Sequence, residues 1–437
     1  MRALRNNLID PDNGLVNRSI YVDKEIYNQE LEQIFGRCWL FLGHESQIPK
    51  PNDFLAAYMG EDPVLLTRDS KGKLHGFLNM CRHRGNRICR ADFGNAPSFM
   101  CTYHGWTFAT DGKLVGVPGY KEAYFEELDR SQWGLVEAAQ IDSFHGLVFA
   151  TWDKKTPPLL DYLGDMAWFL DLTLNRRASG IEFVSGVHKW VIPSNWKMPS
   201  DNFAGDGYHI ATTHRSIMMA RGANVERNLG NPNSTRRGVY PGNGHGAGPI
   251  DINPSSYGQP EGGGRGGVLG TYYKQHAAEL EKQLGPLKAR YAAARTTSNT
   301  NTFPNLATIQ TSFRIWHPRG PEKTEVWSYV YADKDAPDEV KKALRDSVLQ
   351  SFGPSGNLEQ DDMNNFNQCT SSGKSLVAQQ YPMNLQLGLH HESRDEQIPG
   401  LLTTSPSEVN QRGFYSWWAK MMDAPSWDEI KLDPRKN

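Results

Sequence analysis

The sequence predicts an α+β fold: a small antiparallel β domain followed by a larger domain in which an antiparallel sheet is flanked by helices. From Trp39 to about Trp152 the chain consists mostly of short alternating runs bounded by turn residues, which is typical of antiparallel strands. After the paired prolines Pro157-Pro158, strand patterns mix with helix patterns. The 437 residues suffice for two or three domains at about 100–200 residues each.

The N-terminal segment, residues 1–38, contains a helical pattern at residues 23–35. Its apolar residues recur with a 3.6-residue period, and Asp23 is placed as an N-cap. We expect this segment to pack on the larger domain.

The small domain is expected to span residues 39–155. Its clearest strand patterns are at 64–68, 74–79, 106–108 and 146–150, and Asp111-Gly112 is a good hairpin turn.

The larger domain is expected to span residues 156–437. Its strand patterns are at 307–316 and 324–331, and a helix pattern with proline in its first turn covers 337–345. The stretch from 230 to 270 is rich in Gly, Pro and Asn, which predicts a long loop, either a lid near the active site or a surface insertion.

Composition excludes several classes of protein. A net charge of −2 and a pI near 6.7 argue against a nucleic-acid-binding surface. No apolar run approaches the ~20 residues that span a bilayer, and the first residues lack the apolar stretch of a secretory signal. With five cysteines and no such signal, we expect reduced thiols in a cytoplasmic protein with no nucleic-acid or membrane partner.

Two loops each pair one cysteine with one histidine: Cys81-Arg82-His83 and Cys101-Thr102-Tyr103-His104. Zinc sites more often pair like with like, whereas in a Rieske [2Fe–2S] centre two Cys hold one iron and two His hold the other. Each loop would supply one ligand to each iron. The sequence therefore predicts a Rieske cluster on Cys81, His83, Cys101 and His104. The alternatives are a structural zinc site or four unconnected buried residues.

A Rieske cluster only passes single electrons, so the chemistry requires a second site. His209 and His214, with the distant carboxylates Asp361 and Asp362, offer the two-His, one-carboxylate triad of non-haem Fe(II) oxygenases. On a regular helix the two rings would point roughly 140° apart. We therefore expect a π-bulge or a broken turn between them. Residue chemistry alone does not choose between the two aspartates.

The chain resembles the Rieske ring-hydroxylating dioxygenases, especially the α subunits of the naphthalene and biphenyl dioxygenase type. The matching segments extend over nearly the whole chain: Cys81–Gly85, Cys101–Trp106, Asn195–Lys197, Asp201–His214 and Phe352–Asp362.

By motif position the resemblance implies that His209, His214 and Asp362 bind a mononuclear iron. It also implies that Asp206 bridges this site to the Rieske histidine of a neighbouring subunit, here His104. Asn202 matches a polar position near the iron.

The resemblance implies an enzyme that adds both atoms of O₂ to an aromatic hydrocarbon and releases a cis-dihydrodiol. Electrons would come from NAD(P)H through a reductase and a ferredoxin, and the chain would assemble with a β subunit as α₃β₃. The arginines at 82, 84, 87 and 90 would either guide an acidic ferredoxin or form a solvated basic surface.

Two alternatives remain at this point. A Rieske monooxygenase or demethylase, acting on a substituted or carboxylated aromatic, would use the same metal motifs. A Rieske electron-transfer protein would not need the ~280 residues that follow the cluster domain.

The positions that match the family's substrate pocket contain no Arg or Lys, which predicts a neutral hydrocarbon rather than a carboxylated ring. Leu358 stands where naphthalene-type enzymes carry tryptophan, and Gly207 is smaller than their alanine, so the pocket should admit polycyclic or biaryl substrates. An Arg or Lys from residues 230–270 would reverse the argument on charge. The pocket positions are Asn202, Phe203, Gly207, Ile210, Leu306, Phe352 and Leu358.

Overall fold

The protein was analysed as a computed structural model, which describes residues 8–220, 236–251, 267–293, 299–404 and 406–435. The chain forms two compact units. The smaller unit is Phe35–Leu159, and the larger unit combines Met1–Ile34 with Leu160–Asn437. The predicted α+β class is confirmed, because antiparallel sheets and helices both occur and every strand pairing is antiparallel among the described residues.

The smaller unit contains three antiparallel sheets, of strand order β6-β5-β4-β7, β10-β9-β8 and β11-β12-β3. The predicted turn Asp111-Gly112 joins β9 to β10, with Gly112 in the left-handed region at φ +81°. The strands are β3 (Leu40–His44), β4 (Asp53–Met59), β5 (Asp62–Arg68), β6 (Leu74–Leu78), β7 (Phe93–Asn95), β8 (Ser98–Met100), β9 (Thr107–Ala109), β10 (Leu114–Gly116), β11 (Gln140–Phe144) and β12 (Leu147–Thr151).

The larger unit is built on an eight-stranded antiparallel sheet of order β13-β19-β18-β17-β16-β15-β14-β21, within the part of the chain that the structure describes. Every residue of β16, β17 and β18 is buried, so both faces of the central sheet are covered. The strands are β13 (Ile181–Ile192), β14 (Arg237–Tyr240), β15 (Gly246–Gly248), β16 (Asn299–Thr302), β17 (Leu306–Ile309), β18 (Ser312–Pro318), β19 (Thr324–Asp333) and β21 (Leu401–Thr404). A small sheet contains β1 (Ile9–Asp10), β2 (Leu15–Val16) and β20 (Met383–Asn384).

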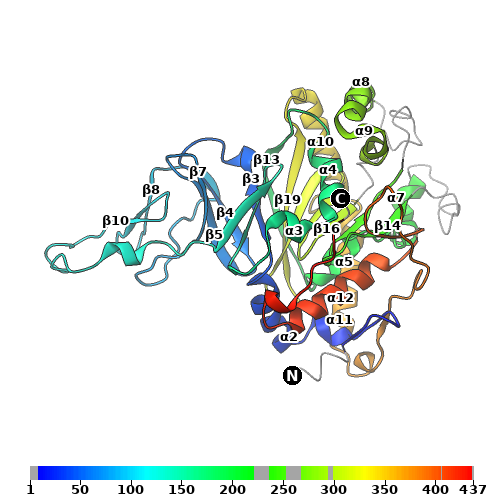
Figure 1. The fold of residues 1–437 in the computed structure, drawn as a ribbon, viewed down its shortest axis with the longest axis horizontal. Coiled ribbons are helices and arrows are strands. Elements are labelled where there is room, and N and C mark those ends of the chain that lie inside the picture. The colour runs from blue at the N-terminus through cyan, green and yellow to red at the C-terminus, as the bar shows by residue number, and fades with distance from the viewer. Residues whose placement is uncertain (1–7, 221–235, 252–266, 294–298, 405, 436–437) are drawn as a thin grey trace. The chain divides into compact units, whose positions relative to one another are not determined.

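Helices surround this sheet (Figure 1). Helix α5 packs against β15, β16 and β17 and against α11 and α12, whereas α10 packs against β19 and α4 against β15. The helices are α2 (Lys24–Glu30), α3 (Leu159–Leu163), α4 (Met166–Leu174), α5 (Lys197–Phe203), α6 (Ile210–Thr213), α7 (Arg215–Ala220), α8 (Val268–Gln275), α9 (Ala277–Ala293), α10 (Asp338–Phe352), α11 (Glu359–Ser372) and α12 (Val409–Asp423).

Two predicted segments differ from the structure. The run 307–316, predicted as one strand, is a hairpin of β17 and β18 that turns at Gln310, whose φ is +53°. The stretch 230–270, predicted as a long loop, contributes β14 and β15 to the interior of the sheet. Its glycines allow this close packing: a Cβ on Gly246 would lie 2.5 Å from the Ala204 backbone oxygen.

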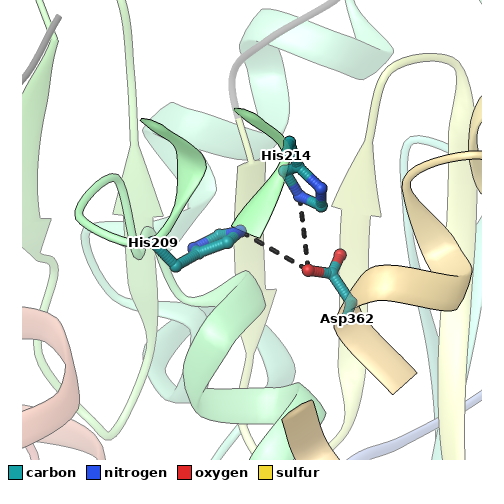
Figure 2. Close-up of side chains that lie close together, drawn as sticks. All are labelled: His209, His214 and Asp362. Atoms are coloured by element: carbon teal, nitrogen blue, oxygen red, sulfur yellow. Dashed lines mark ion pairs between the residues drawn. The ribbon is translucent and has the colours of Figure 1, made fainter. Parts of the chain in front are cut away.

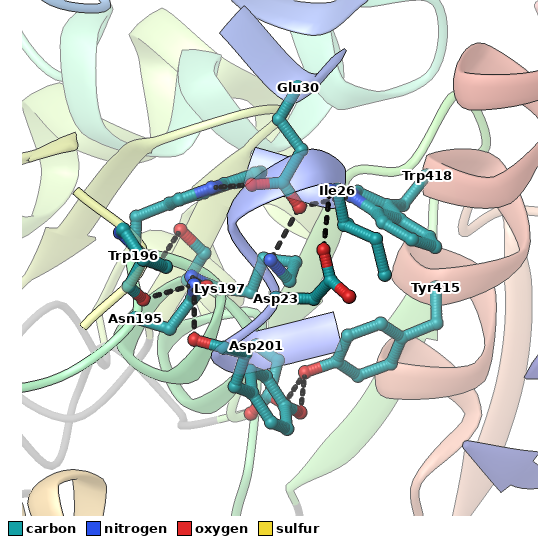
Figure 3. Close-up of polar contacts among 12 residues, drawn as sticks. Asp23, Ile26, Glu30, Asn195, Trp196, Lys197, Asp201, Tyr415 and Trp418 are labelled. Atoms are coloured by element: carbon teal, nitrogen blue, oxygen red, sulfur yellow. Dashed lines mark hydrogen bonds and ion pairs between the residues drawn. The ribbon is translucent and has the colours of Figure 1, made fainter. Parts of the chain in front are cut away.

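The N-terminal helix is held by a buried carboxylate. Asp23 caps α2 by accepting hydrogen bonds from the amides of Glu25 and Ile26, as predicted. At the other end of α2, Glu30 accepts hydrogen bonds from Lys197 Nζ and from the indole nitrogens of Trp196 and Trp418, as Figure 3 shows. Because Glu30 and Lys197 are fully buried, this network fixes α2 to the start of α5.

Candidate metal centres and substrate cavity

The two Cys/His loops share one backbone conformation. In the first, the Cys81 amide donates to Asn86 O (2.8 Å) and the Gly85 amide donates to Cys81 O (2.9 Å). In the second, Cys101 donates to Trp106 O (2.8 Å) and Gly105 donates to Cys101 O (2.9 Å). Both loops need glycine at this turn, since φ is +78° at Gly85 and +75° at Gly105.

The loops bring the four predicted cluster residues together. The rings of His83 and His104 lie 4.4 Å apart, and the thiols of Cys81 and Cys101 are buried and hydrogen-bonded to each other. Backbone N–H groups point at both sulfurs, and Asn86 Nδ2 lies 3.5 Å from Cys101 Sγ. Hydrogen bonds to sulfur are typical of iron–sulfur sites.

His83 has the character of a metal ligand. Its Nδ1 atom is buried and has no hydrogen-bond partner among the described residues. Burial, together with the neighbouring His104 and Arg84, lowers the pKa of His83, so the neutral imidazole that binds metals is favoured. These residues fit a Rieske cluster.

The second pair of histidines lies where a helix is interrupted. Helix α6 covers only Ile210–Thr213, with His209 at its N-cap and His214 at its C-cap, and α7 starts at Arg215. The helical path therefore ends at His214 itself, whereas the four residues between the two histidines are helical, so the π-bulge or broken turn expected between them is absent from this described segment. The two ring centroids lie 5.2 Å apart.

A carboxylate from α11 completes this cluster. Asp362 Oδ1 lies 3.6 Å from His209 Nε2 and 3.3 Å from His214 Nε2, and Figure 2 shows both rings directed at the same oxygen. One ligand atom from each residue lies within 4.8 Å of the others, a separation that one metal ion can bridge. Asp361 lies only beside His214, with its Oδ2 atom 3.6 Å from Nδ1.

The far side of His209 contacts a second carboxylate. Asp206 Oδ2 lies 3.1 Å from His209 Nδ1, and Asn202 Nδ2 lies 3.3 Å from the same nitrogen. Burial alone would lower the pKa of His209, but Asp206 and Asp362 outweigh it and raise the pKa. A metal cation on Nε2 would replace the proton that these carboxylates attract.

A cavity of about 270 Å³ adjoins the three residues. Five of the seven predicted pocket residues line it: Asn202, Phe203, Ile210, Phe352 and Leu358. Gly207 and Leu306 are absent from its lining. The residues that the sequence reasoning missed are Ile217, Met218, Arg236, Asn299, Ile309 and Gln310.

The expectation of a lining without Arg or Lys is wrong, because Arg236 lines the cavity. It precedes β14, inside the 230–270 stretch whose contribution to the pocket could not be derived from its composition. Burial lowers the pKa of Arg236 to about 10, so the guanidinium is still a cation at neutral pH.

Family comparisons cover both units. Residues 175–424 match the family described as "Ring hydroxylating alpha subunit (catalytic domain)", and residues 38–136 match "Rieske [2Fe-2S] domain". The biphenyl dioxygenase subunit alpha of Paraburkholderia xenovorans is 38% identical over 441 residues, covering 97% of this chain and 94% of the relative. The large oxygenase component of the naphthalene 1,2-dioxygenase system of Pseudomonas aeruginosa is 35% identical over 100% of this chain and 98% of its own.

Solved structures agree with these relatives. A naphthalene 1,2-dioxygenase mutant bound to phenanthrene superposes with a TM-score of 0.89 at 34% identity, covering 97% of this chain and 96% of that one. The naphthalene 1,2-dioxygenase from Rhodococcus sp. bound to indole superposes with a TM-score of 0.85 at 35% identity, covering 97% of this chain and 98% of that one.

The two domains imply two cofactors, a Rieske [2Fe–2S] cluster and a mononuclear iron. The alternatives of a structural zinc protein and of an electron-transfer protein are therefore wrong. None of the helices described here is both long and apolar enough to cross a membrane.

Proposed function

Because this chain belongs to the family of ring-hydroxylating dioxygenase α subunits, we propose that it converts a polycyclic or biaryl aromatic hydrocarbon to a cis-dihydrodiol. The chain is an aromatic-ring dioxygenase, and its relatives are named for biphenyl, benzene and naphthalene. The substrate class is the proposed part.

The observation that carries the proposal is the position of the triad beside the cavity. His209, His214 and Asp362 are the proposed ligands of the mononuclear iron, and all three line the cavity. Iron held by these three residues would supply the activation of O₂ beside the substrate. Two histidines and one carboxylate leave coordination positions unfilled by protein.

The apolar part of the remaining wall holds the substrate ring and excludes water. Phe203, Phe352 and Leu358 offer apolar surface of the kind that aromatic rings bind. No side-chain nucleophile is needed; the task of these residues is to place one edge of the ring against the iron site.

Asp206 is the proposed bridge for electrons. It holds His209 through Nδ1, so it fixes the tautomer and orientation of the ring. We propose that in the assembly it also contacts His104 of a neighbouring copy. A closed head-to-tail ring gives every cluster a neighbouring iron site.

Exposed apolar side chains of the smaller unit support this assembly. Large apolar side chains of the smaller unit are exposed, and Tyr103 beside His104 is 59% exposed. An exposed aromatic side chain beside a cluster ligand, as Tyr103 is beside His104, is a candidate for burial in an interface between subunits. The proposed assembly is α₃β₃ with a separate β subunit. The other exposed large apolar side chains of this unit are Phe93, Met100, Val115, Phe125, Trp133 and Val136.

The proposed electron donors are a ferredoxin and an NAD(P)H-dependent reductase. We place the reaction in the cytoplasm, because the structure joins none of the five cysteines in a disulfide.

Product analysis under ¹⁸O₂ tests the proposal. The chain would be supplied with a β subunit, ferredoxin and reductase, and offered naphthalene, phenanthrene and biphenyl. Two labelled oxygens in a cis-diol are expected. A single labelled oxygen would instead indicate a monooxygenase, and conversion of none of the three hydrocarbons would contradict the substrate class.

A further inference from the structure

The C-terminal end of helix α5 is held by side chains of the distant helix α12. Asn410 Nδ2 donates hydrogen bonds to Ala204 O and, at 2.9 Å, to Ala247 O. Gln411 Nε2 donates to Asp201 O, also at 2.9 Å. The last carbonyl groups of a helix have no partner within the helix itself, so α12 caps the end of α5 from outside.

The side chain of Asp201 is held by the same helix. The Tyr415 hydroxyl donates to Asp201 Oδ2, and Figure 3 shows the tyrosine directed at the carboxyl from α12. Asp201 lies in the last turn of α5, where the negative end of the helix dipole disfavours a carboxylate. The hydrogen bond from Tyr415 offsets this effect and joins the last turn of α5 to α12.

A glycine allows α12 to approach the chain at the point where it leaves α5. Gly205 is in the left-handed region with φ +127°. A Cβ atom on Gly205 would overlap Asn410 Nδ2 and would lie 2.9 Å from Ala247 O. Any other residue at position 205 would separate Asn410 from the two carbonyl groups that it bonds.

The residue that follows Gly205 is Asp206, the proposed bridge for electrons. Its amide donates to Asn202 O (3.0 Å), and its Oδ1 atom accepts from the amides of Tyr208 (2.8 Å) and His209 (3.2 Å). Its Oδ2 atom lies 3.1 Å from His209 Nδ1. These contacts all lie within residues 202–209. The place of this segment in the larger unit therefore depends on how the end of α5 is held.

We propose that Asn410 and Tyr415 are positioning residues for electron delivery, because they fix the end of α5 and so hold Asp206 against His209. Neither residue lines the substrate cavity. This inference rests on the proposed function, since it takes Asp206 as the route of the electron. In that step the reduced cluster loses one electron and the mononuclear iron site gains it.

Single-turnover measurements on two variants test the inference. Tyr415→Phe removes the hydroxyl but keeps the ring, and Asn410→Ala removes both donated hydrogen bonds. Each reduced holoenzyme, with a β subunit, would be mixed with O₂ and a hydrocarbon that the wild type converts, and reoxidation of the cluster would be followed by absorption. The rate should fall about 10- to 100-fold, while the iron content and the dissociation constant of the hydrocarbon stay unchanged.

Hydrogen exchange gives a readout that does not depend on turnover. The amides of Tyr208 and His209 donate to Asp206, so their exchange should become faster in both variants, whereas exchange in the rest of the larger unit should not change. Tyr21→Phe is the matched control. It removes the hydroxyl that lies 2.5 Å from that of Tyr415 but keeps the bond from Tyr415 to Asp201, so it should change neither the reoxidation rate nor the exchange.

The proposed function and this inference fail differently. If Asp206→Ala slows reoxidation but Tyr415→Phe and Asn410→Ala do not, only the inference is wrong. Faster exchange throughout the larger unit with a normal reoxidation rate would also overturn it, because the two residues would then serve stability alone. If Asp206→Ala leaves reoxidation normal, the proposed electron bridge is wrong and the inference falls with it.

Discussion

Asp206 and Asp362 hold the His209 imidazole from opposite sides: Asp206 lies 3.1 Å from Nδ1, and Asp362 lies 3.6 Å from Nε2. A ring held in this way has one tautomer and one orientation when a metal binds at Nε2. The two carboxylates are therefore expected to have separable effects, one on electron delivery and the other on metal binding.

Asp206→Ala should keep both cofactors and lose most turnover. The ligand atoms of His209, His214 and Asp362 are unchanged by the substitution. The carboxylate that orients His209, and that we propose as the bridge to the cluster of a neighbouring copy, is removed. Changes at such supporting residues typically cost 10–100-fold. Iron analysis, the spectrum of the cluster and product formation would be measured together. Normal turnover with both metals in place would show that electrons take another path.

Asp362→Ala should lose the mononuclear iron but keep the cluster. Asp361→Ala is the matched control, since Asp361 contacts only the Nδ1 side of His214 and should retain the iron. Metal analysis of the two purified variants decides between the aspartates. The reverse pattern would assign the ligand to Asp361.

Much of this site could be predicted from the sequence because its chemistry is local. The paired Cys/His loops and the spacing of His209 and His214 are visible in short segments. The geometric argument that a regular helix would separate the two histidines predicted a break between them, whereas the structure keeps residues 210–213 helical and ends α6 at His214.

The cavity was predicted less completely because its walls come from distant strands. Side chains alternate along a strand, so Leu306 points away from the face on which Ile309 lines the cavity. Arg236 is placed in the cavity wall by the strand that follows it, β14. No local sequence pattern indicates that β14 pairs with β15 and β21. The strands within 230–270 contain several glycines, and their composition suggests a loop although tertiary pairing makes them strands.

The exposed arginines of the first cluster loop should make ferredoxin binding depend on salt. Arg84, Arg87 and Arg90 are exposed, whereas Arg82 lies over Trp133 and donates to Gly134 O. An acidic ferredoxin would be attracted by these charges, and added salt screens the attraction.

The apparent Michaelis constant for ferredoxin should therefore rise as salt is added. The double variant Arg84→Gln with Arg90→Gln should have a higher constant at low salt and a weaker dependence of that constant on salt. Lys113→Gln on the same unit serves as a control for net charge. A constant that does not change with salt would indicate a solvated basic surface instead.

His245 should make stability fall in mild acid. It is fully buried, its Nδ1 accepts a hydrogen bond from the Phe303 amide, and its Nε2 lies 3.0 Å from Tyr162 O. Burial lowers its pKa from 6.5 to about 4, although the Tyr162 carbonyl opposes the shift. Between these values the unfolded chain binds a proton that the folded protein does not, so stability falls as pH drops from 6.5 towards 4.

The loss from His245 between pH 7 and pH 5 should be about 2 kcal/mol, from the shift of the pKa. Urea unfolding at both pH values would compare the wild type with His245→Gln, in which the amide can accept from Phe303 and donate to Tyr162. The variant should show a smaller loss in acid. The same pH dependence in both proteins would mean that folding does not lower the pKa of His245.

Arg314→Met should destabilise the larger unit strongly. Arg314 and Glu359 form an ion pair in which both side chains are buried, and Arg314 also donates to Phe352 O and lies over the rings of Phe203 and Phe352. Without Arg314, the Glu359 carboxylate is left buried without its cation at the start of the helix that carries Asp362. Breaking such a pair typically costs about 3–5 kcal/mol.

The double variant Arg314→Met with Glu359→Gln should recover much of that stability, because no charge remains buried. Lys342→Met breaks the exposed pair with Asp346 on α10 and should leave urea unfolding unchanged. If the double variant is no more stable than Arg314→Met, the contribution of Arg314 to the stability of the larger unit comes from packing of its guanidinium against the rings of Phe203 and Phe352 rather than from the ion pair.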